Sequence, residues 1–301
     1  SEKDKLFLRK RLSGIQLSLG YYNEGWMNRR YNWIKNIEKF NLVNKQNSSL
    51  TYLISIEQIS KNEKLLIWND GGYGDYIYQL RLLKYIPKNI FYKIYTSKMD
   101  HLVKNKDIIT NKAVDFHWHL PMNEIPRIIN YNPSNHFDFK FNYLRKPNKK
   151  FENYKSYVAV TYKTETSIKK SIPYPLLKNL FIEKEDIKFI ILQNILSENE
   201  KSFFSIYKNV SYIENLDNNF IFEDTFSIIS SVKFVISVDT AITHIAGYLG
   251  KKNYLLLKHP SSFYWGYKNT KSTDYYNHII IRQNKTNDWQ SALRKLLEQI
   301  K

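Results

Sequence analysis

The 301-residue chain has no cysteine, and it uses glycine and proline sparingly, at nine and eight residues. The lack of cysteine excludes a disulfide framework and any metal site with a cysteine ligand, and it suits a reducing compartment. No apolar run approaches the roughly 20 residues that a membrane-spanning helix needs. The first residues also lack a signal-peptide pattern. We therefore expect a cytoplasmic protein, or one that lies peripherally at the inner face of a membrane.

Acidic residues are scarce as well: 28 stand against 46 basic residues, which gives a net charge of +18. Such a charge suits nucleic acid, an anionic membrane surface or an acidic ligand as partner. Lysine is spread along the whole chain and no DNA- or RNA-binding motif is present, which argues against nucleic acid. Heavy use of lysine, asparagine, isoleucine and tyrosine also fits AT-rich coding sequence, which would explain part of the excess without any partner. With 43% hydrophobic residues, the chain can fill about two domain cores.

Two familiar nucleotide-binding motifs are absent. The spacing Gly72-x-Gly74 would need a third small residue at position 77 for a dinucleotide fingerprint, but that position is Ile77. The Gly-Lys-Ser/Thr of a P-loop does not occur either. We expect Gly71, Gly72 and Gly74 instead to let the backbone turn sharply and approach a ligand closely.

What is present is a strand–turn–helix–strand unit in residues 232–258. The apolar run 234–238 predicts a buried strand of a parallel sheet. Asp239 and Thr240 then break the run, and both residue types cap helices. The residues that follow form one apolar helix face: Ile242, Ile245, Ala246 and Leu249.

The turn of this unit carries the candidate chemistry. A helix N-terminus presents unpaired N–H groups and a positive dipole end, so it binds phosphate well. Thr240 can add a hydroxyl, and His244 lies four residues later on the same side of the helix. We expect both to face a cleft at the carboxyl end of the strand. The alternative is that Asp239 is an ordinary cap and His244 an exposed helix residue.

Residues 64–95 repeat the pattern in the first half of the chain. A strand at 65–68 leads into the glycine turn, a helix is expected over 76–86, and a second strand over 90–95. Asp75 lies at the turn. It is either a cap for the helix or a carboxylate that faces the cleft, and the two roles are compatible.

The second-half motif resembles a known donor site. Asp239-Thr240-x-x-x-His244, followed by Ala246-Gly247-x-Leu249-Gly250-Lys251, is similar to the signature of the lipopolysaccharide heptosyltransferases, glycosyltransferase family 9. It is more similar still to their relatives fused to tetratricopeptide repeats. The resemblance is strongest in residues 222–251. It implies that the helix start, Ala241 included, binds the diphosphate of a nucleotide-sugar.

The same resemblance assigns roles in the first half. Gly74-Asp75 resembles the Gly-Asp pair in the first loop of these families, where the aspartate is the proposed general base. His119 lies in a stretch that resembles a His-x-Pro loop of these families, and it is the second candidate for the general base. His117 with His119, without a nearby carboxylate or cysteine, is too little for a metal site. We expect neither a metal nor a cofactor.

Further donor-site residues follow from the resemblance. A basic residue just before Ile172-Pro173 is implied to reach the donor phosphates; that is Lys170, with Lys163 in the same loop. A solvated basic loop is the alternative. Asp224 and Thr225 resemble a Phe-x-Asp-Thr element beside the nucleotide. Relatives also carry an Asp-Trp-Arg-Trp loop, of which this chain clearly matches only Trp265, so the sugar specificity is not carried over.

The implied architecture is α/β: the GT-B fold, with two Rossmann-like domains that face a cleft. Residues 1–40 are expected to form a helical cap like the last pair of a tetratricopeptide array, packed on the catalytic domain. Residues 41–150 would form the acceptor domain, and 151–301 the nucleotide-sugar-binding domain.

The leading functional hypothesis is an inverting, metal-independent glycosyltransferase. It would move a sugar from a nucleotide-sugar to a glycan, lipid-linked or protein acceptor, in peripheral contact with an anionic membrane surface. One alternative is a non-catalytic nucleotide-sugar-binding or scaffold protein, which would bind the ligand without turnover. The other is a basic nucleic-acid-binding protein, whose affinity would fall steeply with salt.

Overall fold

The computed structural model describes residues 2–30, 49–96, 100–136, 143–164, 167–217 and 222–300. The chain divides into two compact units. Unit 1 comprises Ser1–Arg145 and Ser262–Tyr267, and unit 2 comprises Lys146–Ser261 and Lys268–Lys301. The sequence analysis assigned residues 262–267 to the C-terminal domain, whereas the structure groups them with unit 1.

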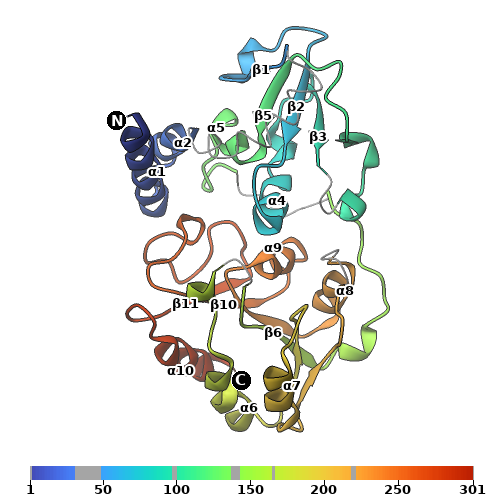
Figure 1. The fold of residues 1–301 in the computed structure, drawn as a ribbon, viewed down its shortest axis with the longest axis vertical. Helices are drawn as coiled ribbons and strands as arrows, with labels where there is room; N and C mark the ends of the chain where they lie inside the picture. The colour runs from blue at the N-terminus through green and yellow to red at the C-terminus, as the bar shows by residue number, and fades with distance from the viewer. Residues whose placement is uncertain are drawn as a thin grey trace. The chain divides into compact units, whose positions relative to one another are not determined.

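Unit 1 contains a five-stranded sheet in the order β1-β5-β2-β3-β4, in which every strand pair is parallel (Figure 1). Its strands are β1 (Thr51–Tyr52), β2 (Lys64–Trp68), β3 (Phe91–Tyr95), β4 (Ile109–Thr110) and β5 (Trp118–Pro121). Leu65, Leu66 and Ile67 of β2 are fully buried, as a continuous apolar run in a parallel sheet requires.

The edge strand β1 is only two residues long. The carbonyl groups of Leu53 and Ile54 accept hydrogen bonds from the Arg127 guanidinium. The N–H groups of Ile54 and Ser55 donate to the Gln58 side chain. The backbone groups that would extend the ladder are therefore bonded to side chains.

Helix α4 (Tyr73–Leu80) follows the glycine turn, and it begins and ends earlier than the predicted helix at 76–86. It starts early because the Gly72 carbonyl already accepts from the Tyr76 N–H at 3.0 Å. It ends early because the Leu82 N–H bonds to the Gln79 carbonyl, which tightens the chain into 3₁₀ turns. A short helix, α5 (Ile125–Ile128), follows β5.

Two helices open unit 1: α1 (Glu2–Leu19), which ends at Gly20 with φ of +90°, and α2 (Tyr22–Arg29). Most of the apolar stripe of α1 is exposed: Leu8, Leu12, Ile15 and Leu19. The pair packs instead through buried Leu17 against Gly25, and the Trp26 indole donates to the Tyr131 carbonyl at 2.9 Å. The remainder of the predicted cap, with Tyr31, Trp33 and Ile34, lies outside the described residues.

Unit 2 contains a six-stranded sheet in the order β11-β10-β9-β6-β7-β8, again with every pair parallel. Its strands are β6 (Tyr157–Thr161), β7 (Lys188–Ile191), β8 (Val210–Tyr212), β9 (Phe234–Val238), β10 (Asn253–Leu257) and β11 (His278–Arg282). Counted along unit 2, this is the order 3-2-1-4-5-6 of a doubly wound sheet. The α/β class with two parallel sheets is confirmed, and the cleft stays a prediction.

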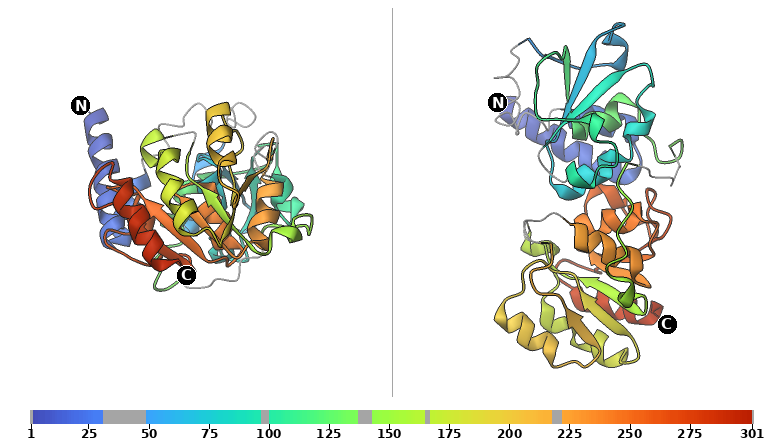
Figure 2. Two further views of the ribbon diagram at one scale, coloured as in Figure 1. Left: turned by 90° about the horizontal axis from the view of Figure 1, so that it is seen from below. Right: turned by 90° about the vertical axis from the view of Figure 1, so that its right-hand side faces the viewer.

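Helices cover both faces of the second sheet. Side chains from one face form a hydrophobic core with α6 (Lys178–Glu183) and α10 (Trp289–Gln299). Helix α10, which is drawn dark red in Figure 2, packs on β10 and β11. Helix α7 (Glu198–Ser205) adds Phe204 to this core. Helix α9 (Ala241–Tyr248) packs on β9 and β10, and it contacts α8 (Glu223–Ser231). Among the described residues, no helix is both long and apolar enough to cross a membrane.

Candidate functional site

The sheet order of unit 2 directs attention to the carboxyl ends of β6 and β9. These strands are neighbours, and the strand order reverses between them. In open α/β sheets, ligands bind outside the carboxyl ends of strands at such a reversal. Strand β6 leads into the loop that carries Lys170, and β9 leads into Asp239 and Thr240. Two of the predicted donor-site segments therefore meet at the expected place.

The start of α9 is fixed by side-chain hydrogen bonds. Thr240 is the N-cap, and its hydroxyl accepts from the Ile242 N–H at 3.2 Å. One turn on, the buried Thr243 hydroxyl donates to the Val238 carbonyl at 3.0 Å and lies 2.7 Å from the Ser237 hydroxyl. Strand and helix are thus joined rigidly, and the N-terminus of α9, at Thr240 and Ala241, is only partly buried.

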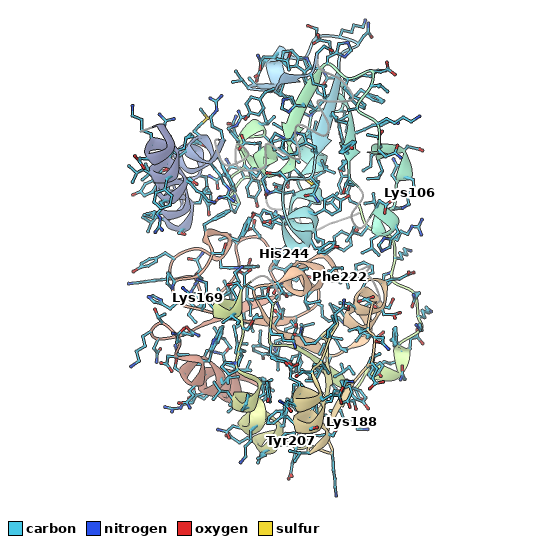
Figure 3. All side chains as sticks on the ribbon, viewed as in Figure 1. Lys106, Lys169, Lys188, Tyr207, Phe222 and His244 are labelled. Carbon is cyan, nitrogen blue, oxygen red and sulfur yellow. The ribbon has the colours of Figure 1, made fainter. Side chains whose placement is uncertain are left out.

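Lys170 lies beside this helix start. Its ammonium is 2.7 Å from Asp239 Oδ2, and the two side chains keep 30% and 11% of their surface exposed. Lys170 is the last residue of a 3₁₀ turn, Ile168–Lys170. The middle residue of this turn, Lys169, is labelled in Figure 3. The structure therefore brings together three predicted residues, Lys170, Asp239 and Thr240, and it places a cation at a helix N-terminus.

Lys163, the other lysine predicted for this site, is committed elsewhere. Its ammonium lies 2.7 and 2.8 Å from the two carboxylate oxygens of Glu200 on α7. Burial alone would raise the pKa of Glu200, but the hydrogen bonds from Lys163, Tyr162 and Ser197 lower it to about 2. We therefore assign Lys163 a structural ion pair and not a contact with the donor.

Asp224 and Thr225 lie at the start of α8. The buried carboxylate of Asp217 accepts from both of their N–H groups, at 2.6 and 3.0 Å. The Asp224 side chain pairs with Lys150 at 3.1 Å. An acidic side chain thus already occupies the anion position at this helix start. Sequence analysis missed Asp217, because nothing in its local pattern marks it as a cap for a helix that begins six residues later.

His244 does not face an open site. Its side chain is buried, and its Nδ1 lies 3.0 Å from the Tyr275 hydroxyl. Tyr275 also packs on α9 at Gly247, where an added Cβ would lie 2.3 Å from the ring. The alternative of an exposed helix residue is therefore wrong, and the donor contact of His244 stays a prediction. The Tyr275 segment, which is distant in sequence, covers this face of the helix.

In unit 1 the strand order reverses between β2 and β5, so the equivalent position lies after Trp68 and Pro121. Asp75, in the first turn of α4, accepts from the Gly72 N–H through Oδ2 at 3.1 Å. Its other oxygen, Oδ1, accepts from the Tyr264 hydroxyl at 2.8 Å. Asp75 is thus both a helix-capping residue and a partly exposed carboxylate held by two donors.

Asp70 is a second carboxylate at this position, which sequence analysis missed. Asn123, after β5, donates its backbone and side-chain N–H groups to Asp70 Oδ1 at 3.0 and 3.1 Å. Burial raises the pKa of Asp70 to about 6, although these hydrogen bonds oppose the shift. The signal in the sequence was its place directly after a buried strand.

The glycine turn explains why one glycine is needed. A Cβ at Gly71 would lie 2.6 Å from Asp75 Cβ and 3.0 Å from Asn123 Nδ2, whereas one at Gly72 would lie 3.8 Å from Asp75 Oδ2. Gly71 therefore permits the close packing of Asp70, Asp75 and Asn123 within this turn. Gly74 lies inside α4.

We expect Gly71→Ala to lower the free energy of unfolding by about 1–3 kcal/mol, because overpacking displaces the side chains around it. Gly72→Ala is the matched control, with room for the methyl group and an ordinary φ of −78°. Urea denaturation of both variants measures the difference. Equal stability of the two variants would contradict the packing described for Gly71.

His119 lies on β5 with a buried ring, packed near Tyr52 and Trp68. Its Nδ1 accepts from the Trp68 indole N–H at 3.2 Å, and burial lowers the pKa of His119 to about 4. The ring is therefore neutral and bonded inside the sheet. We assign it no catalytic role.

An open cavity of about 570 Å³ lies at the amino ends of β9 and β10, away from Thr240. Four lysines line it: Lys233, Lys251, Lys252 and Lys271. Lys251 donates to the carbonyl groups of Ser230 and Val232. The last carbonyl groups of a helix, as here at the end of α8, have no partner within the helix itself. In the described part of the chain, no cluster of three or more metal-ligating side chains occurs.

Neither a protein-family model nor a curated protein matches this sequence. Solved structures do. The Escherichia coli heptosyltransferase WaaC with ADP matches at 14% identity and a TM-score of 0.49, over 78% of this chain and 99% of that one. A family 9 glycosyltransferase from Veillonella parvula matches at 7% identity and a TM-score of 0.48, over 79% of this chain and 92% of that one. The iron-containing dodecameric glycosyltransferase TibC from enterotoxigenic E. coli matches at 11% identity and a TM-score of 0.43, over 66% of this chain and 59% of that one. The chain is thus similar in structure to glycosyltransferases, the class that its sequence motifs resemble.

Proposed function

We propose that this protein is an inverting glycosyltransferase that uses a nucleotide-sugar donor. The observation that carries the proposal is the Lys170–Asp239 pair at the capped start of α9, where the strand order of unit 2 reverses. A helix N-terminus with an adjacent cation suits a diphosphate. The signature around Thr240, which resembles the heptosyltransferase donor site, supports the same ligand.

In the proposed reaction, a hydroxyl oxygen of the acceptor attacks the anomeric carbon of the donor. The bond from that carbon to the phosphate oxygen breaks, and the nucleoside diphosphate leaves. Lys170 and the α9 N-terminus stabilise the charge on the leaving group, which is the largest catalytic contribution in many enzymes. Because this chain can supply that charge itself, metal-independent transfer is part of the proposal.

Asp75 takes the proton of the acceptor hydroxyl in this proposal. Of the two carboxylates near the glycine turn, Asp75 is partly exposed, whereas Asp70 is buried beneath Asn123. A general base must reach the proton that it removes, which favours Asp75. The acceptor itself, whether glycan, lipid-linked or protein, would be recognised in unit 1.

A thermal-shift screen against ADP-, GDP-, UDP- and CMP-sugars tests the proposal. A ligand at 100 times its Kd stabilises the folded protein by about 2.7 kcal/mol, which is readily measured. We expect one nucleotide class to raise the melting temperature. No shift with any member of the panel would contradict the proposed donor, and binding without transfer to any acceptor would favour a non-catalytic binding protein.

We expect Lys170→Ala to lower the affinity for the nucleoside diphosphate by about 10- to 100-fold, because one hydrogen bond between charged groups is lost. The carboxylate of Asp239, no longer neutralised by Lys170, would then also repel the phosphates. The free nucleoside should bind as before, because it carries no phosphate. Calorimetry on both ligands separates these effects.

Lys169→Ala is the matched control for this variant. It removes the same charge from the adjacent, exposed position in the same turn, but Lys169 is not paired with Asp239 in the structure. It should bind both ligands as the wild type does. An equal loss in the two variants would mean that general charge, and not the position of Lys170, governs affinity.

A further inference from the structure

The segment Ser262–Tyr267 connects two parts of unit 2 in sequence but belongs to unit 1 in space. Its 3₁₀ turn, Phe263–Trp265, contacts α1. The Phe263 ring lies edge-on to Trp26 at 5.9 Å, and the Arg29 guanidinium lies 4.4 Å above the same ring. Aromatic and cation–π contacts therefore hold the segment in one place.

The next residue, Tyr264, connects this segment to the glycine turn and to α4. Its ring packs on Tyr78 of α4 with centroids 4.5 Å apart. Its hydroxyl donates to Asp75 Oδ1 at 2.8 Å, although the two residues lie 189 positions apart in the chain. Burial raises the pKa of Tyr264 well above its ordinary value, and the charge of Asp75 adds to the shift. The hydroxyl therefore keeps its proton and acts as a donor.

Together with the Gly72 N–H on Oδ2, Tyr264 gives each oxygen of Asp75 one donor. Two donors on different oxygens fix the plane of the carboxylate. A carboxylate has about four acceptor sites, so room remains for an acceptor hydroxyl. The backbone bond to Gly72 is local, whereas the bond to Tyr264 requires the segment 262–267 to be in place.

We propose that Tyr264 is a positioning residue that orients Asp75 for proton removal. The proposal rests on the proposed function, because it assumes that Asp75 is the general base. In it, the Tyr264 hydroxyl holds the carboxylate in one rotamer. The catalytic geometry of unit 1 then depends on a segment from the C-terminal half of the chain.

Tyr264→Phe tests the proposal, because it removes the hydroxyl and keeps the ring against Tyr78. We expect kcat to fall about tenfold or more while donor affinity is unchanged, since the carboxylate loses its fixed orientation. A purely structural role would not lower kcat selectively while donor affinity is kept.

Tyr267→Phe is the matched control, since Tyr267 is an exposed tyrosine in the same segment. It should keep the wild-type kcat and donor affinity. An unchanged kcat in Tyr264→Phe would overturn the proposal. A faster Tyr264→Phe enzyme would overturn it too, because the hydroxyl would then be occupying the place of the acceptor.

A second measurement needs no turnover. In thermal unfolding, Tyr264→Phe and Asp75→Ala should lower the melting temperature by less in combination than the sum of the single variants, because they remove the same hydrogen bond. Strict additivity would overturn the proposal even if the enzyme is active. An inactive wild type with intact coupling would instead count against the proposed function.

Discussion

Replacing Asp75 by asparagine should lower the rate of sugar transfer by about 10²-fold or more, while donor affinity stays the same. An amide cannot accept the proton of the acceptor hydroxyl, and general-base catalysis typically contributes about 10²–10⁴-fold. The loss should appear in kcat, because the proton moves only in the reaction and not on donor binding.

The fold should tolerate this change. In one orientation of the amide, its oxygen accepts from the Gly72 N–H, and its nitrogen donates to the Tyr264 oxygen, which can accept as well as donate. Both contacts of Asp75 are then kept. Asparagine also caps helices about as well as aspartate does.

The measurement is paired: calorimetry for the donor, and the transfer rate with a responsive acceptor. Asp107→Asn is the matched control, because it makes the same substitution at an exposed position of unit 1. Near-normal turnover in the Asp75 variant would make Asp75 a helix cap only. The role of base would then pass to Asp70, the other carboxylate of the turn.

Replacing Asp70 by asparagine should stabilise the protein at neutral pH, by about 3 kcal/mol at most. The pKa of Asp70 is raised from 3.8 to about 6 because the side chain is buried. Keeping it ionised at pH 7 therefore costs folding free energy. The asparagine oxygen can still accept from Asn123, so the neutral side chain avoids that cost.

The sign of the pH dependence follows from proton binding. Between pH 4 and 6 the folded state holds a proton on Asp70 that the unfolded state has released, so the contribution of Asp70 to stability falls as pH rises through this window. Urea denaturation at several pH values should show the variant and wild type nearly equal at pH 4 and furthest apart above pH 7. A difference that does not change with pH would contradict the buried, ionised Asp70.

The elements that sequence predicted best are those whose patterns are local. The β9–α9 unit was predicted because a continuous apolar run, two capping residues and a helical stripe follow one another within 232–258. The strand predicted at 65–68 corresponds to β2 in the same way. Lys170 was predicted by its place before Ile172-Pro173, and it does reach the start of α9.

What sequence could not predict depends on contacts between distant residues. Lys163 pairs with Glu200 and His244 is covered by Tyr275, and neither partner is indicated by local spacing. The hydrogen bond from Tyr264 to Asp75 joins residues from the two halves of the chain, so no local pattern in either half predicts it. Asp70 is buried and accepts hydrogen bonds from Asn123, which lies 53 positions later in the chain.

The most direct test of the account is a crystal structure of the protein with the nucleoside diphosphate that the thermal-shift screen selects. We predict that the diphosphate binds at the N-terminus of α9, within hydrogen-bonding distance of Lys170 and of the backbone N–H groups that follow Thr240. A diphosphate bound in the lysine-lined cavity at the amino ends of β9 and β10, with the start of α9 unoccupied, would contradict the account.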